Sequence, residues 1–554
     1  MATTHRLPPR PQPLQVSSAN GGSRPNYIIF MPDQLRYDSL ACTDAPTGDG
    51  KLLRTPHIDG FRARGTLFTN CYTQASVCSQ SRCSIFTATY PHVSGHRSLN
   101  NLIKPWEPNL FRSLREEGGY HVACLAPRGD TFAPHVTELS LDEYGFLETP
   151  EFMPRFGKGQ QKLEAPPEDI FSRLFYKGLR KRNATENNNN EDGEDDDPAS
   201  DLQNIIDYDE AVIRSAEQWL DCPPTDKPWV LFMPLIFPHC PFAVEEPYFS
   251  MYDRTQLSSP LATSNPAAKT GYEPRYMAAN RARYGTDRAT DDVWREVKAT
   301  YYGMITRLDD QFGRILRKVD SVPGLWDETV TMFFTDHGEY LGDHGMIEKW
   351  PSGLSDALVR EPLIIGGAGL PRGKTVAAMT EMVDLCPTMF EMSGIGEHFP
   401  HNGKSWIPVL CGDATEHKPY AFSEGGFLTS EEPLLEQAPY PYDIKAALQH
   451  EDTELVGKAV SLRDREWAYV YRLYEPAELY HRHSDPHELH NLAAEAEHKE
   501  RVDKYEKVMM RWLMEGSDFV PWEKDDRFPK VELKSPKEQL EERQRNGGKT
   551  AAVA

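Results

Sequence analysis

Two polar pairs follow short apolar runs and could share one divalent cation. Asp33 and Gln34 follow the run 27–31, and Asp336 and His337 follow the run 330–334. Oxygen donors suit hard cations such as Ca²⁺ and Mg²⁺, whereas an imidazole ligand also admits Mn²⁺. We therefore expect these four side chains to hold one metal ion. Ordinary helix-capping and loop roles are the alternative, which four candidate ligands at two strand ends make less favourable.

The segment 76–89 places Cys78 four residues before Arg82, just ahead of an apolar helical pattern. A helix N-terminus offers free backbone N–H groups and the positive end of a dipole, so it favours anions. This segment is therefore a candidate site for a nucleophile that acts on an anionic substrate. Taken alone, it is equally consistent with a buried structural cysteine beside a surface arginine.

Two further apolar runs end in polar residues of the same kind. Arg128 and Asp130 follow the run 121–125, and His239 follows the run 229–233. Helical patterns lie between the runs, as at 109–117 and 301–319. Alternating buried strands and helices predict an α/β fold with a mostly parallel sheet, in which ligands bind beyond the carboxyl ends of the strands. The polar residues at the four strand ends are thus expected to converge.

Composition narrows the class of protein. The 554 residues include 84 acidic and 61 basic side chains, for a net charge of −23. This acidity argues against a general nucleic-acid binder, and 39% apolar residues argue against wholesale disorder. No run of about 20 apolar residues predicts a membrane span, and residues 1–24 lack the apolar stretch of a secretory signal, so we expect a cytoplasmic protein without a membrane partner. Nine cysteines at this density favour reduced thiols.

The chain divides by composition into five parts. Residues 1–24 read as a disordered leader, and 25–414 as the catalytic α/β domain. An acidic, asparagine-rich insertion at 183–198 interrupts that domain. Residues 415–522 read as a smaller α+β subdomain, with strands expected at 459–463 and 467–473 and a helix at 500–514. Residues 523–554 read as an exposed, charged tail.

Taken in order, the motifs resemble those of the sulfatase family, within the alkaline-phosphatase-like superfamily. The likeness runs from Pro25 to about Ala493. It rests on the cysteine–arginine segment and on five landmarks, namely Pro56-His57-Ile58-Asp59, Pro238-His239-Cys240-Pro241-Phe242, Asp336-His337-Gly338-Glu339 through to Lys349, Val383-Asp384-Leu385-Cys386-Pro387-Thr388, and Asp485-Pro486-His487-Glu488-Leu489-His490-Asn491-Leu492. The resemblance implies a large mixed, mostly parallel sheet flanked by helices, with a smaller C-terminal α+β domain.

The resemblance also implies a mechanism. Cys78 would be oxidised to Cα-formylglycine by the formylglycine-generating enzyme, and its hydrate would be the nucleophile and a further metal ligand. His239 would protonate the leaving alcohol, Arg82 would hold the nucleophile, and Lys349 would bind the anionic ester. The implied cofactor is one divalent metal, Ca²⁺ or Mn²⁺, with Mg²⁺ as a further candidate. The histidine at position 337, where the family often has asparagine, favours Mn²⁺.

Two positions depart from the family pattern. Gln80 stands where the maturation motif usually has proline, which bears directly on whether Cys78 is converted. Arg128 stands in the region where many members carry a lysine, so it is a candidate substrate clamp with bidentate geometry. No histidine follows it, which leaves the base of the second chemical step unassigned, with Asp130 and His96 as candidates. His96 is also a candidate substrate-binding residue.

The predicted function is hydrolysis of a sulfate ester of a small organic alcohol or phenol. An alternative is a phosphonate monoester or phosphodiester hydrolase, because sulfuryl and phosphoryl groups share a tetrahedral shape and differ mainly in charge. A third reading is a binding protein in which Cys78 is never converted and turnover is low. The sequence leaves the natural alcohol and the oligomeric state open.

Overall fold

The structure, a computed structural model, describes residues 24–43, 49–150, 175–180, 206–260, 270–438, 442–520, 522 and 524–550. The predicted leader, up to residue 23, and the acidic insertion at 183–198 lie outside these described residues. By contacts the chain forms two compact units, Met1–Asp518 and Phe519–Ala554.

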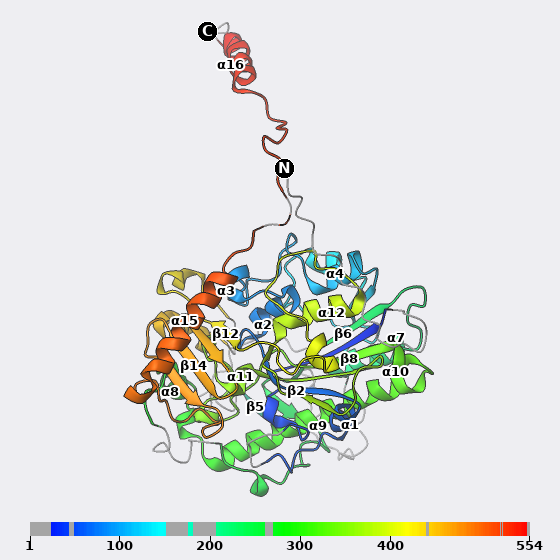
Figure 1. The fold of residues 1–554 in the computed structure, drawn as a ribbon, viewed down its shortest axis with the longest axis vertical. Helices are drawn as coiled ribbons and strands as arrows, with labels where there is room; N and C mark the ends of the chain where they lie inside the picture. The colour runs from blue at the N-terminus through cyan, green and yellow to red at the C-terminus, as the bar shows by residue number, and fades with distance from the viewer. Residues whose placement is uncertain are drawn as a thin grey trace, which may run out of the picture. The chain divides into compact units, whose positions relative to one another are not determined.

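A nine-stranded sheet forms the centre of the first unit (Figure 1). Its order is β10-β2-β9-β8-β1-β6-β3-β4, and β11 also pairs with β2. The strands are β1 (Asn26–Asp33), β2 (Gly65–Tyr72), β3 (His121–Cys124), β4 (Glu143–Tyr144), β6 (Trp229–Pro238), β8 (Thr329–Phe333), β9 (Arg360–Gly367), β10 (Lys374–Val376) and β11 (Thr380–Glu381). Only β9 runs against its neighbours β8 and β2, so the sheet is mixed and mostly parallel, as predicted.

The four apolar runs of the sequence form four adjacent strands, β8, β1, β6 and β3. They are parallel to one another, with Tyr27 opposite both Val330 and Val230, and with Val122 also opposite Val230. Almost every residue of β1, β6 and β8 is buried, as expected for strands covered on both faces. Because parallel strands end at one edge, the polar residues that follow them meet there.

Helices cover both faces of the sheet (Figure 1). On one side lie α1 (Pro56–Arg64), α7 (Tyr208–Trp219), α10 (Leu325–Glu328) and the 31-residue α9 (Asp291–Ser321), which extends the predicted 301–319 helix by ten residues at its start. On the other side lie α2 (Cys78–Thr87), α4 (Leu110–Glu116) and α12 (Leu385–Ser393). Asp309 of α9 accepts the backbone N–H groups of His57 and Ile58, which fixes the first turn of α1 and explains one family landmark.

The C-terminal part of the first unit has its own antiparallel sheet of β12 (Ala421–Gly425), β13 (Ala459–Arg463), β14 (Trp467–Arg472) and β15 (Glu478–His481). Helix α15 (Lys499–Gly516) packs against this sheet through Tyr505, Met509 and Trp512. The predicted strands at 459–463 and 467–473 and the amphipathic helix at 500–514 are therefore present. Residues 415–518 of the predicted 415–522 subdomain belong to the same compact unit as the large sheet.

The remaining elements include α8 (Arg275–Tyr284), α13 (Ile407–Cys411), α14 (Asp443–Glu451), β5 (Tyr176–Leu179) and β7 (Phe242–Val244). The second unit contains α16 (Pro536–Thr550). All nine cysteines are free thiols. Within the ranges that the structure describes, no helix combines the length and apolarity needed to cross a bilayer.

Candidate active site

Arg82 binds the two central carboxylates of the site, those of Asp33 and Asp336. Its Nε donates to Oδ2 of Asp336 at 2.8 Å, and its Nη2 donates to Oδ2 of Asp33 at 3.0 Å. All three side chains are fully buried. Because Arg82 takes one oxygen of each carboxylate, the other oxygens, Oδ1 of Asp33 and Oδ1 of Asp336, remain on the side of His337, 3.6 and 3.9 Å from its Nε2.

Cys78 is the first residue of α2 and faces this pair. Its Sγ lies 3.1 Å from Nε2 of His337 and 3.7 Å from Oδ1 of Asp33. The hydroxyl of Ser81, one turn later, donates to the carbonyl of Asp336 at 2.6 Å, which ties the helix to the end of β8. Burial raises the pKa of the Cys78 thiol, and Asp33 raises it further. The surrounding side chains therefore keep an unmodified Cys78 neutral, which makes it a poor nucleophile.

The donor atoms of Asp33, Cys78, Asp336 and His337 all lie within 4.8 Å of one another. Two carboxylates with one oxygen each not bound by Arg82, an imidazole nitrogen and the atom on residue 78 form a donor set that fits one divalent cation. Burial lowers the pKa of His337, so its ring is neutral and able to ligate. The residues present thus fit the metal that the sequence predicted.

Gln34 lies beside this cluster in a strained backbone conformation. Its φ is +65°, a left-handed conformation that a residue with a side chain rarely adopts. Its N–H donates to Oδ1 of Asp336 at 3.2 Å, and its carbonyl accepts from the Tyr301 hydroxyl at 2.8 Å. Its Oε1 accepts from Lys349 at 2.7 Å, and its Nε2 donates to Glu339. These contacts hold the strained turn beside the carboxylates.

Arg128 adds a second guanidinium next to Asp33. Its Nη2 donates to Oδ2 of Asp33, and its Nε donates to Oδ2 of Asp130 at 2.8 Å, while Arg82 donates to the other oxygen of Asp130 at 3.2 Å. Burial by itself would raise the pKa of Asp33, but Arg128, His239 and Arg82 hold it well below its usual value. Asp33 is therefore ionised across the physiological pH range.

His239 and Lys349 form a proton-sharing pair on another side of the cluster. Nζ of Lys349 lies 2.8 Å from Nε2 of His239, and Nδ1 of His239 faces the carbonyl of Cys240 at 2.5 Å. Burial and the ammonium of Lys349 lower the pKa of His239 to about 4. At neutral pH the proton of this pair therefore resides on Lys349. Asp209 of α7 fixes the strand end before His239 by accepting the N–H groups of Ile236 and Phe237, each at 2.8 Å.

The structure thus brings together nine of the ten side chains predicted for the site, namely Asp33, Gln34, Cys78, Arg82, Arg128, His239, Asp336, His337 and Lys349. His96 is the exception. Its Nδ1 faces the carbonyl of Asn101 at 2.8 Å, and its Nε2 lies 3.3 Å from Glu107. Gln80 is buried, and its Nε2 donates to the carbonyl of Arg97 at 3.2 Å.

Four side chains beside the cluster were not predicted as site residues from the sequence. Glu339 accepts from Gln34 and from the backbone N–H of Leu341 at 2.8 Å, and it lies within a motif that could have pointed to it. Glu348 lies in the same motif, next to Lys349, whereas Tyr442 and Lys445 lie outside every motif of the site. Tyr442 meets the ring of His239 edge-on, with ring centres 6.4 Å apart, although it is about 200 residues away in the chain.

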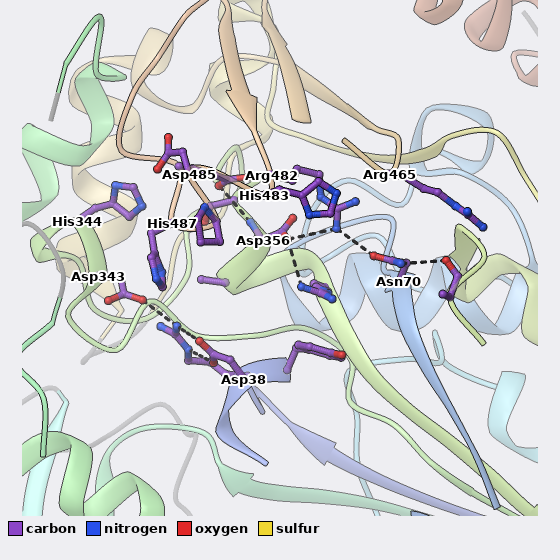
Figure 2. A pocket seen from close by; sticks show the side chains of 18 residues that line it. Asp38, Asn70, Asp343, His344, Asp356, Arg465, Arg482, His483, Asp485 and His487 are labelled. Carbon is purple, nitrogen blue, oxygen red and sulfur yellow. Dashed lines mark hydrogen bonds and ion pairs between the residues drawn. The ribbon is translucent and has the colours of Figure 1, made fainter. Parts of the chain in front are cut away.

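A cavity of about 350 Å³ lies outside this cluster, and none of the nine clustered side chains lines it. Figure 2 shows that arginine, histidine and aspartate side chains, among them Arg482, His487 and Asp356, line this cavity. Arg36 pairs with Asp38 at 2.6 Å and Asp343 at 2.8 Å, and it also donates to the carbonyls of Glu339 and Tyr340. Arg36 therefore joins the turn after β1 to the loop after β8, and both of these carry predicted metal ligands.

Comparisons with known proteins agree with this geometry. A family model described as Sulfatase matches residues 25–395. The "Multifunctional alkaline phosphatase superfamily protein PehA" of Trinickia caryophylli is 26% identical, over 90% of this chain and 96% of its own length. An arylsulfatase of Clostridium perfringens is 24% identical, over 88% of this chain and 94% of its own length. The solved phosphonate monoester hydrolase of Agrobacterium radiobacter superposes with a TM-score of 0.65 at 20% identity, covering 89% and 96% of the two chains. The predicted fold class and family resemblance are confirmed.

Proposed function

The chain belongs to the sulfatase family, a family of sulfuric ester hydrolases, and from this premise we propose that it hydrolyses a sulfate ester of a small organic alcohol or phenol. The observation that carries the proposal is the convergence of three cationic side chains, Arg82, Arg128 and Lys349, around one nucleophile position, residue 78. Such a cluster suits a tetrahedral oxyanion group that gains charge during transfer.

Each residue of the cluster has a role in this proposal. Asp33, Gln34, Asp336, His337 and residue 78 hold one divalent cation, and the imidazole favours Mn²⁺ over Ca²⁺. When bound, the cation polarises an ester oxygen and lowers the pKa of a hydroxyl beside it. The chain's own part is to orient the nucleophile through Arg82, to clamp the anionic ester between Arg128 and Lys349, and to exclude water from a fully buried carboxylate pair.

Lys349 and His239 supply the proton for the leaving oxygen in this proposal. Their nitrogens share one proton, which burial and charge place on Lys349 in the free protein. A leaving alkoxide that develops beside the pair would draw this proton, directly from Lys349 or through the His239 ring.

We propose that residue 78 acts as Cα-formylglycine, made from Cys78 by a formylglycine-generating enzyme. The support is the first-turn position of Cys78 and the environment that keeps an unmodified thiol neutral. The test is peptide mass spectrometry on protein from the native host. An aldehyde or its hydrate at residue 78 is the expected result. A thiol alone, with metal and anion binding but no turnover, would instead support the unmodified binding protein.

A phosphonate monoester hydrolase is the second candidate. A named relative, PehA, is described as multifunctional, and a phosphonate monoester hydrolase shares this fold over most of its length. Parallel assays with an aryl sulfate and an aryl phosphonate monoester of matched leaving group decide between the two. The sulfate ester is expected to give the higher kcat/KM, and the reverse ranking would favour the phosphonate.

A further inference from the structure

A lysine from the C-terminal part of the chain contacts Glu348, the residue next to Lys349 of the proposed anion clamp. Lys445 lies on α14, in the segment between β12 and β13, and only 8% of it is exposed. Its Nζ donates to Oε2 of Glu348 at 3.1 Å, and Oε1 of Glu348 lies 3.4 Å from Nζ of Lys349. One buried carboxylate therefore lies between two ammonium groups.

The backbone around Glu348 holds this carboxylate in place. Glu348 has a φ of +65°, which a residue with a side chain adopts only when its surroundings impose it. Its N–H donates to Oε1 of Glu339 at 2.5 Å, and Glu339 is itself held by Gln34 and Leu341. Both the backbone N–H and the carboxylate of Glu348 are therefore held, and this fixes the turn that carries Lys349.

The direction of Lys349 depends on how strongly Glu348 attracts it. Its Nζ lies 2.7 Å from Oε1 of Gln34 and 2.8 Å from His239, both closer than Glu348. Lys445 shares the charge of Glu348, and a carboxylate that serves two ammonium groups attracts each less than one that serves a single group. Without Lys445, Glu348 would draw Lys349 away from Gln34 and toward itself.

We propose that Lys445 is a positioning residue for Lys349 and acts through Glu348, so that α14 completes the anion clamp. This inference rests on the proposed function for the role of Lys349. It assigns to the segment between β12 and β13 a part in binding the ester, although none of its residues belongs to a sequence motif of the site.

A purely structural ion pair is the competing explanation, and epistasis separates the two. If Lys445 acts through Lys349, Lys445→Met loses its effect once Lys349 is already Met. A structural role would lower stability equally in both backgrounds. Lys445→Arg keeps the charge within reach of Glu348 and should restore the clamp, whereas Lys445→Met keeps only the length of the side chain.

The experiment measures KM and kcat with an aryl sulfate, and Kd for inorganic sulfate by calorimetry, on the full chain well below its melting temperature. Lys499→Met serves as the matched control, because Lys499 pairs with Asp503 on the exposed face of α15. For Lys445→Met we expect KM and the sulfate Kd to rise about tenfold or more, with kcat changed less than about threefold. Lys445→Arg should return both to near wild type.

The sulfate Kd keeps this test separate from that of the proposed function. If the wild type hydrolyses neither sulfate nor phosphonate esters, the proposed function fails, while the Kd comparison still decides the role of Lys445. A sulfate Kd for Lys445→Met equal to that of the wild type and of Lys499→Met overturns the proposal. A tenfold loss that persists in the Lys349→Met background overturns it as well.

Discussion

Nζ of Lys349 lies 2.8 Å from Nε2 of His239, so one proton can be held by either nitrogen. Burial and the neighbouring ammonium lower the pKa of His239 to about 4, so the imidazole is neutral at pH 7 and accepts the hydrogen bond. Sequence motifs suggested the histidine alone as the acid. We propose instead that the proton donor is the pair, with the proton on the lysine.

His239→Ala and Lys349→Met should therefore show the same dependence on the leaving group. A donor to the leaving oxygen matters most when the alcohol is weakly acidic, so we expect losses in kcat of about 10²-fold or more for phenyl sulfate. The loss should be much smaller for 4-nitrophenyl sulfate. Because the two residues act as a unit, the double variant should lose little more than either single one. Equal losses for both substrates would rule out proton donation by this pair.

The paired carboxylates predict stabilisation by a divalent cation. Asp33 and Asp336 each place the oxygen that Arg82 does not bind beside His337, so bound metal should raise the thermal unfolding temperature. At a hundredfold excess over Kd the gain in the free energy of unfolding should be about 2.7 kcal/mol. Scanning calorimetry of chelated protein titrated with Mn²⁺, Ca²⁺ and Mg²⁺ checks this. Asp33→Asn should abolish the shift. Asp320→Asn, at an exposed pair with Arg64, should leave it intact, and a shift retained in Asp33→Asn would contradict the proposed ligand set.

Arg128 is expected to act as a clamp for the ester. Its guanidinium already pairs with Asp33 and Asp130, so it is held in place before substrate arrives. Arg128→Ala should raise KM and lower kcat/KM by about 10²-fold, a typical loss for one charged donor. Arg128→Lys should recover only part of this, because an ammonium cannot serve two carboxylates in the same plane. Steady-state kinetics that leave kcat/KM unchanged in Arg128→Ala would refute the role.

The sequence predicted the four central strands because each is a short apolar run that ends abruptly in polar residues. Parallel order then brings Asp33, Arg128, His239 and Asp336 to one edge without further information. The antiparallel direction of β9 could not be predicted, because its short apolar run 363–365 indicates a buried strand but not the direction of that strand. Direction is set by the connections, which apolar patterning does not record.

The parts of the site that remained hidden depend on contacts over long sequence distances. Lys445 meets Glu348 across 97 residues, and before folding it is one lysine of an ordinary amphipathic helix. His96, by contrast, has contacts that do not include the nine clustered side chains among the described residues. Its position shortly after Cys78 suggested a place in the site, but its loop directs the ring toward Asn101 and Glu107. Closeness in sequence indicates closeness in space only within one element.

Glu361 offers a test of stability away from the proposed chemistry. It is fully buried on β9, and within the described ranges neither of its carboxyl oxygens has a hydrogen-bond partner. Burial, with a smaller contribution from Asp336, raises its pKa well above the usual value, so the folded protein keeps this group protonated. The unfolded chain ionises near pH 4.3. Stability contributed by the proton is therefore complete below that pH and falls as pH rises toward the folded-state pKa, by up to about 1.4 kcal/mol per pH unit.

Glu361→Gln should remove this pH dependence, because an amide of the same shape does not ionise. Urea unfolding between pH 4.5 and 8 should show the variant gaining stability on the wild type as pH increases. Glu116→Gln, at an exposed pair with Arg112, should run parallel to the wild type at every pH. A difference between Glu361→Gln and wild type that stays constant from pH 4.5 to 8 would mean that the carboxyl ionises in the folded protein, and that a partner for it exists within the core.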